Sequence, residues 1–334
     1  MWGTVLKHLR GRDRQAVAYT DAEYLAAVAQ IFSRAGRPFD RSRFGLRCIR
    51  SGNAVLQLTQ IEVANPRGVV VFLPGTNAYS LLYAEVLTMW ADAGYTVIGV
   101  DPRGHGRSSG ARGSYTVREL LADATAALND ARERWSAPLF IGGSSQGAIV
   151  ALYLATAQDD LAGAFCHNVA DLADPRSVEC TRSPRLFRYA RWLLPLLGQT
   201  IPELPIPLSV YLDLQREPVS GFSSAVELLG LDPLLTPYVR AKTLAALAVA
   251  APPRPLESLR TPVFVLHGAR DQIFPATYVQ HIFRRIGGPK QLHVVERGHH
   301  YTIIDDIPRY RDALLRWMDV QRAARGQRTI LSRA

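Results

Sequence analysis

The chain has 334 residues, of which 48% are apolar and 20% are charged. A chain of this length and composition can bury a large core, which excludes an intrinsically disordered protein and a polytopic membrane protein. The formal net charge of +10 suggests a polyanionic partner, so the distribution of that charge matters.

The positive charge is concentrated at the two ends of the chain. Residues 1–50 contain 10 basic and 4 acidic residues, residues 309–334 contain 7 and 2, and the middle is nearly neutral. The sequence has no nucleic-acid-binding motif, so we expect no nucleic-acid partner. Weak peripheral attraction of the ends to an anionic lipid surface fits this distribution better.

The number of cysteines and the N-terminal sequence indicate the cellular compartment of the protein. The three cysteines are too few and too scattered for a disulfide framework, and the first residues contain no apolar segment typical of a secretory signal. We therefore expect a cytoplasmic protein.

Strands and helices alternate along most of the chain. A helix is predicted over 21–34, and two strands over 45–50 and 55–62. Short continuous apolar runs, typical of strands buried on both faces, follow at 69–73, 96–100, 139–141, 162–166 and 263–266. Helical patterns separate or follow them at 78–92, 116–134, 146–158, 276–286 and 308–323. The alternation predicts an α/β fold with a doubly wound, mostly parallel sheet.

Residues 170–258, which we call the cap segment, interrupt this alternation. Twelve of the 21 prolines lie between Pro175 and Pro255, among apolar clusters that a linker would lack. We interpret the segment as a helical insertion between two late strands, either a packing subdomain or a lid with an apolar inner face. The predicted organisation is a helical extension (1–43), a core (44–169 and 259–325), the cap segment and a basic tail (326–334).

The pattern G-x-S-x-G occurs twice, around Ser145 and around Ser108. Only the first follows a predicted strand and begins a predicted helix. A turn between a strand and a helix raises the serine hydroxyl out of the sheet and directs N–H groups at the helix start toward an anion. We therefore predict Ser145 as a nucleophile, the alternative being a glycine-rich turn with an incidental serine. Ser108 is interpreted as scaffold.

A serine nucleophile needs a base and an acid that orients it. His299 and His300 lie in a loop after a strand predicted at 292–296, where a histidine can reach the carboxyl edge of the sheet. Asp271, directly after the strand at 263–266, is the preferred acid, and Asp171 is the rival.

Two backbone amides are predicted to bind the oxyanion that develops on the substrate. One belongs to Gln146, immediately after the nucleophile, and the other to Thr76, in the loop after the strand at 69–73. Gly75 permits the tight turn that would leave the Thr76 amide free.

Taken in order, these motifs resemble the α/β-hydrolase superfamily, in particular the branch of monoacylglycerol lipases and lysophospholipases. The matching residues are Pro74-Gly75-Thr76, the Asp101–Ser108 stretch, the Ser145 elbow, His267-Gly268-Ala269-Arg270-Asp271 and Gly298-His299. Pro74 departs from the histidine usual in that family. The family places the base directly after glycine, which selects His299.

The resemblance implies a serine hydrolase that needs no cofactor or metal and forms an acyl-enzyme. The apolar cap segment favours carboxylic esters of lipophilic acyl groups, of the monoacylglycerol or lysophospholipid type. Acyl thioesters, lactones and carbon–carbon bonds are alternatives for the same triad, and a non-catalytic binding member of the fold is the alternative of another class. Labelling of Ser145 by a fluorophosphonate would distinguish an enzyme from the last.

Overall fold

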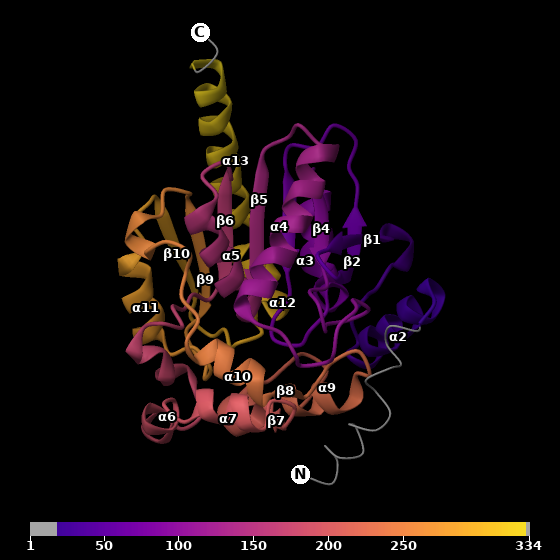
Figure 1. Cartoon of the computed structure of the whole chain (residues 1–334). Helices are drawn as coiled ribbons and strands as arrows, with labels where there is room; N and C mark the ends of the chain where they lie inside the picture. The colour runs from indigo at the N-terminus through magenta and orange to yellow at the C-terminus, as the bar shows by residue number, and fades with distance from the viewer. Residues whose placement is uncertain (1–18, 332–334) are drawn as a thin grey trace.

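A sheet of eight strands forms the centre of the protein in the computed structural model, which describes residues 19–331 and side chains as far as residue 325 (Figure 1). The strand order is β1-β2-β4-β3-β5-β6-β9-β10. The bounds are β1 Gly45–Ser51, β2 Ala54–Ile61, β3 Val69–Leu73, β4 Thr96–Val100, β5 Leu139–Ser144, β6 Gly163–His167, β9 Val263–Gly268 and β10 Lys290–Val295.

Six of these strands are parallel, and the hairpin of β1 and β2 adds the antiparallel edge. Every residue of β3, β4, β5, β6 and β9 is buried, as the continuous apolar runs predicted. The prediction of a doubly wound, mostly parallel α/β sheet is confirmed. Parallel strands end at one edge, so the loops after β3, β5, β6 and β9 are brought together there.

Helices cover both faces of the sheet. The bounds are α2 Asp21–Arg34, α3 Ala84–Asp92, α4 Val117–Arg134, α5 Gln146–Ala157, α11 Ala276–Arg285, α12 Thr302–Asp305 and α13 Ile307–Leu331. Trp90 of α3 packs against Phe72 and Phe165, and Trp317 of α13 packs against Phe264, each with ring centroids 5.6 Å apart. The pleat of the sheet places these aromatic side chains on one face, whereas α4 and α5 lie together on the other.

The structure describes only part of each of the two predicted end segments. Helix α13 extends to Leu331, so the core helix continues through most of the region predicted as a separate tail. The helix predicted at 21–34 is α2, which begins at a capping box made by Thr20 and Glu23. Residues 1–18 of the predicted extension lie outside the described residues.

The cap segment lies between β6 and β9 and covers the carboxyl edge of the sheet (Figure 1). Its elements are η4 Pro175–Cys180, α6 Pro184–Ala190, α7 Leu194–Thr200, β7 Pro205–Pro207, α8 Leu208–Tyr211, η5 Leu214–Arg216, α9 Ala225–Leu231, β8 Tyr238–Arg240, α10 Ala241–Ala248 and η6 Leu256–Ser258. The Asn77 side chain, from the loop after β3, donates hydrogen bonds to the carbonyls of Thr236 and Tyr238 at 3.0 and 2.6 Å. These bonds fasten the cap segment to the core.

Among residues 19–331, none of the helices combines the length and the apolar character needed to cross a lipid bilayer.

Candidate active site

Ser145 occupies a sharp turn between β5 and α5. Its backbone has φ 53° and ψ −117°, a conformation that few non-glycine residues adopt. The turn is tight enough that a Cβ on Gly143 would lie 2.3 Å from the backbone of Gly147, and one on Gly147 would lie 2.2 Å from the carbonyl oxygen of Leu73. Both glycines of the motif are therefore required by close backbone approach.

Two backbone amides beside Ser145 are available to an anion. In the part of the chain that the structure describes, neither the Thr76 amide nor the Gln146 amide donates a hydrogen bond to a protein acceptor. The Tyr83 hydroxyl accepts the preceding amide, that of Gly75, at 3.1 Å, and the Tyr115 hydroxyl donates to the Gln146 side chain at 3.1 Å. These bonds fix the two loops while their amides stay free for an oxyanion.

Asp271, in the loop after β9, is buried and fully hydrogen-bonded. Its Oδ1 accepts the amides of Ile273 and Phe274 at 2.7 and 2.8 Å, and its Oδ2 accepts the Asn168 side chain at 2.8 Å. Burial by itself raises the pKa of Asp271, but the charge and hydrogen bond of His300, together with the Phe274 amide, outweigh it and hold the pKa below its usual value. The carboxylate is therefore ionised at neutral pH.

The histidine that meets Asp271 is His300, and the prediction that His299 would do so is wrong. The Nδ1 atom of His300 lies 2.8 Å from Oδ2 of Asp271. The His299 side chain is 33% exposed and turns its Nδ1 toward Glu217, 4.0 Å from Oε2. The turn after β10 therefore directs the second histidine, rather than the residue that follows Gly298, toward the site.

The environment of His300 suits a proton acceptor. Burial lowers the pKa of its imidazole, but the charge and the hydrogen bond of Asp271 outweigh burial and raise it above the usual value. The ring lies parallel to that of Phe274 at 5.6 Å. His300 and Ser145 line the same small pocket, together with Thr76.

The rival residues are engaged elsewhere. Ser108 is completely buried, where its hydroxyl donates to the carbonyl of Asp101 and accepts the Gln57 amide at 2.8 Å. Asp171 forms an ion pair with Arg285 at 2.9 Å. Each has its hydrogen-bonding capacity satisfied within the scaffold.

A second chain of polar residues behind Asp271 was not predicted from the sequence. Asn168, at the end of β6, joins Asp271 to His267, whose Nδ1 lies 2.6 Å from the Asn168 Oδ1. Asn168 has φ 69°, so its position at a strand end and its tolerance of left-handed backbone were the only signals available. Among the described residues, no cluster of His, Cys, Asp and Glu could hold a metal ion.

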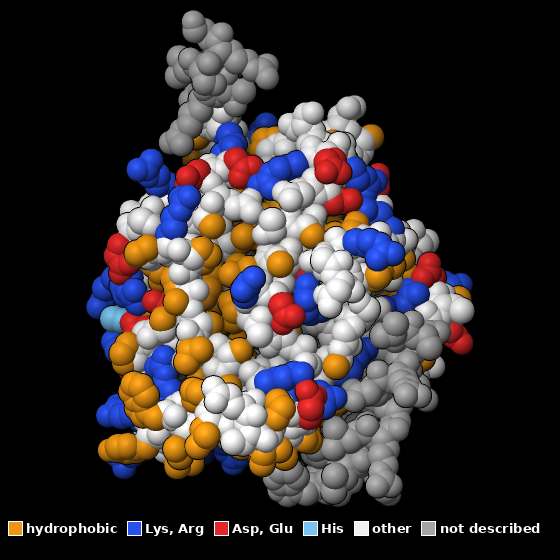
Figure 2. Space-filling view, in the orientation of Figure 1, with side chains coloured by type: hydrophobic (Ala, Val, Ile, Leu, Met, Phe, Trp, Pro, Cys, Tyr) orange, Lys and Arg blue, Asp and Glu red, His pale blue; other side chains and the backbone are white. Residues whose placement is uncertain are grey.

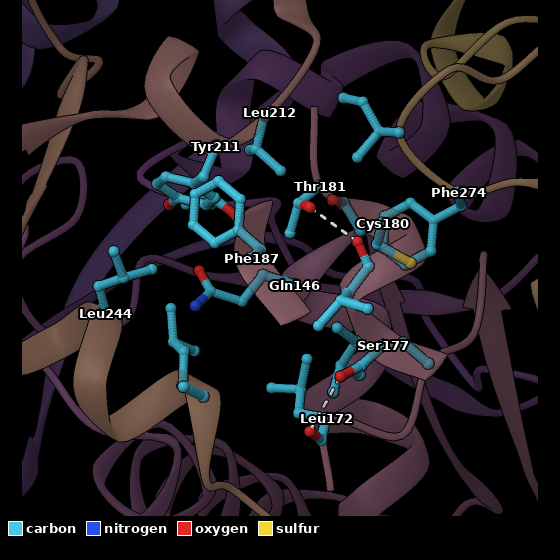
Figure 3. A pocket seen from close by; sticks show the side chains of 18 of the residues that line it. Gln146, Leu172, Ser177, Cys180, Thr181, Phe187, Tyr211, Leu212, Leu244 and Phe274 are labelled. Atoms are coloured by element: carbon cyan, nitrogen blue, oxygen red, sulfur yellow. Dashed lines mark hydrogen bonds between the residues drawn. The ribbon is translucent and has the colours of Figure 1, made fainter. Parts of the chain in front are cut away.

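An apolar cavity opens from Ser145 between the core and the cap segment. Figure 3 shows the mostly apolar side chains that surround it, with Gln146 among them. Residues from α5, η4, α6, α8, α10 and the loop after β9 line it, among them Ile149, Val178, Phe187, Tyr211, Leu244 and Phe274. Of the apolar run 192–197 in the cap segment, Leu194 lines the cavity, whereas Trp192 is 82% exposed.

Comparison with known proteins extends this description. Residues 64–306 match the model of the family described as serine aminopeptidase, S33. A monoacylglycerol lipase of Mycolicibacterium smegmatis is 28% identical over 218 residues, which are 63% of this chain and 72% of the relative.

Solved structures show the same fold. The monoacylglycerol lipase of Paleococcus ferrophilus has a TM-score of 0.61 at 22% identity, covering 79% of this chain and 99% of its own. A soluble variant of the Saccharomyces cerevisiae monoglyceride lipase has a TM-score of 0.63 at 16% identity, covering 85% and 97%.

Proposed function

The chain belongs to the serine aminopeptidase S33 family of α/β hydrolases, and from that premise we propose that it cleaves lipophilic carboxylic esters with Ser145, His300 and Asp271 as its triad. It is a carboxylic ester hydrolase, like the lipase relatives. The observation that carries the proposal is an apolar cavity that begins at a serine in a strained turn, beside a bonded Asp–His pair.

The proposed reaction proceeds through an acyl-enzyme. The neutral imidazole of His300 accepts the proton of the Ser145 hydroxyl as its oxygen attacks the ester carbonyl. The Thr76 and Gln146 amides bind the oxyanion, and Asp271 stabilises the imidazolium. His300 then gives the proton to the departing alcohol, and water attacks the acyl-enzyme by the same steps to release the acid.

The cavity supports the choice of acyl group. Because its lining is mostly aliphatic and aromatic, transfer of an alkyl chain from water into it is favourable by about 0.8 kcal/mol for each buried methylene. We propose that the cap segment acts as a lid over this chain, and that the natural substrate is of the monoacylglycerol or lysophospholipid type, the first of which is also the substrate in the name of the Mycolicibacterium smegmatis relative.

The proposal is tested by labelling and by a substrate series. A fluorophosphonate should label the wild type and leave Ser145→Ala unlabelled. kcat/KM should rise with acyl length across p-nitrophenyl esters, and matched glycerides and lysolipids should be hydrolysed faster than acyl thioesters and lactones. An unlabelled wild type that binds lipid without turnover would identify a binding protein instead.

We further propose a cytoplasmic location with weak peripheral association with anionic membranes. All three cysteines are free thiols, which suits a reducing compartment. Figure 2 shows hydrophobic side chains interspersed with Lys and Arg over α6 and α7, where Tyr189 and Trp192 are 76% and 82% exposed. Sedimentation with phosphatidylserine vesicles, reduced by salt, would support association, and equal binding to neutral vesicles would argue against the charge contribution.

A further inference from the structure

Glu217 places a carboxylate from the cap segment directly behind the proposed triad. It follows η5 and is completely buried. Its Oε1 accepts the amide of Gln272, the residue after Asp271. Its Oε2 accepts the amide of His300 at 2.8 Å. One side chain therefore bonds to both the loop of the acid and the loop of the base.

The backbone around Glu217 is itself fixed. The Glu217 carbonyl accepts the Ala225 amide at 2.9 Å, and the Ser220 amide donates to Asp305 at 3.3 Å. Gly221, at φ 83°, lies so close to the end of α2 that a Cβ would be 2.2 Å from the Ala35 Cα. The carboxylate thus extends from a turn that is braced against the core on two sides.

The charge of Glu217 is coupled to that of His300. Burial raises the pKa of Glu217 to about 7, against the opposing attraction of His300. Reciprocally, after the larger effects of burial and Asp271, Glu217 contributes to raising the pKa of His300. An anion at this position therefore stabilises the imidazolium that forms during catalysis.

The other titratable groups around Glu217 and His300 do not cancel the attraction between the charges of these two residues. His167 and His267 face His300 from β6 and β9, and burial lowers the pKa of both, so they are neutral. His299 faces Glu217 at 4.0 Å. Among the described residues, the carboxylate that hydrogen-bonds the His300 imidazole is Asp271, whereas Glu217 bonds the His300 backbone amide.

We propose that Glu217 is a positioning residue of the cap segment. It holds the Asp271 loop and His300 in their relative positions and adds negative charge behind the imidazole. Among the described residues, the hydrogen bonds of the Glu217 carboxylate go to backbone amides of the two catalytic loops, and removing the carboxylate would leave both amides without an acceptor. This inference rests on the triad proposed above. With Glu217 in this role, the proposed site is complete only while the cap segment is packed against the core.

The test uses two variants of Glu217 and one control. Glu217→Gln removes the charge and one acceptor, Glu217→Asp keeps the charge but shortens the reach, and Glu203→Gln changes an exposed carboxylate of the same segment. kcat and KM for p-nitrophenyl butyrate are measured between about pH 5 and pH 9, with folding checked by circular dichroism and thermal unfolding.

We expect a different signature for each variant. Glu217→Gln should lower kcat by roughly tenfold or more with little change in KM. It should also move the acidic limb of the kcat/KM profile to lower pH by a fraction of a pH unit, because the imidazolium loses an anion that is partly ionised in this pH range. Glu217→Asp should lower kcat while the limb stays near its wild-type position. Glu203→Gln should match the wild type in both.

Failure of the inference is distinguishable from failure of the triad. A folded Glu217→Gln enzyme with wild-type kcat and an unmoved limb overturns the inference, provided that Ser145→Ala is inactive. If Glu217→Gln does not fold, the inference stands on Glu217→Asp, and a wild-type kcat in that variant overturns it. Undiminished turnover by Ser145→Ala would instead overturn the proposed site.

Discussion

The two G-x-S-x-G sequences of this chain place their serines in different structural environments. Ser145 lies in a left-handed turn at the start of α5 and lines two pockets. Ser108 is buried and bonded to the Asp101 carbonyl and the Gln57 amide. The same five-residue pattern thus yields one available hydroxyl and one saturated hydroxyl, and the difference comes from the strand before and the helix after the motif.

The contrast recurs for the other two residue types of the site. Asp271 bonds a histidine, whereas Asp171 bonds an arginine. His300 meets Asp271, whereas His299 points toward the cap segment. The proposed reactive group of each pair is the one directed at the carboxyl edge of the sheet, so each pair can be tested by changing both members.

The serine pair should show the largest difference. Ser145→Ala should lose on the order of a millionfold in kcat, as removal of a triad nucleophile does in a well-studied protease. Ser108→Ala should keep its activity but lose about 1–3 kcal/mol of unfolding free energy, because two buried backbone groups lose their partner. Ester turnover and urea unfolding measure the two effects, and labelling of Ser108 alone would reverse the assignment.

The histidine pair should differ almost as much. His300→Ala should fall to about the level of Ser145→Ala, and the double variant should be little worse, since triad members act as a unit. His299→Ala should retain most of its turnover. Steady-state kinetics on both folded variants provides the measurement, and an inactive His299→Ala beside an active His300→Ala would restore the assignment expected from the sequence.

The aspartate pair comes next. Asp271→Asn should reduce kcat by about 10⁴-fold, because an amide cannot hold the imidazole in its working tautomer or balance its charge. Asp171→Asn weakens the ion pair with Arg285 and should mainly lower the thermal midpoint. If kcat falls further in Asp171→Asn than in Asp271→Asn, the acid lies after β6 instead.

A smaller difference is expected between two nearby residues within the cap segment, Leu194 and Trp192. Leu194→Ser, in the cavity lining, should raise KM for p-nitrophenyl dodecanoate by roughly tenfold while leaving the acetate nearly unchanged. Leu194 is half-buried in the free protein, and a bound long chain would cover the rest of a side chain whose full burial contributes about 1.5–3 kcal/mol. Trp192→Ser, at an exposed position, should leave both substrates unchanged. An equal loss for short and long esters would indicate that Leu194 only packs the segment.

Much of the scaffold could be predicted because local sequence determines it. The strands at 69–73 and 96–100 match β3 and β4 at every residue, since fully buried parallel strands leave continuous apolar runs. The elbow was predictable because it requires a strand, glycines and a helix in one short stretch. Asp271 followed from its place directly after β9.

The histidine was not predictable by the same means. Which of two adjacent side chains faces inward depends on the turn after β10, and that turn is fixed by non-local bonds: Arg270 donates to the Gly298 carbonyl at 2.8 Å, and His300 donates to Glu217. Glu217 lies 83 residues away. A sequence pattern carries no information about such a partner.

The backbone of Ser145 also has a consequence for stability. At φ 53° and ψ −117°, a side chain of any size is strained by about 1–3 kcal/mol, whereas glycine is not. Ser145→Gly should therefore unfold at a higher temperature than Ser145→Ala, even after the larger entropy of glycine in the unfolded chain is counted. The native fold would be more stable without the side chain at its reactive centre, so activity and stability are opposed at this one residue.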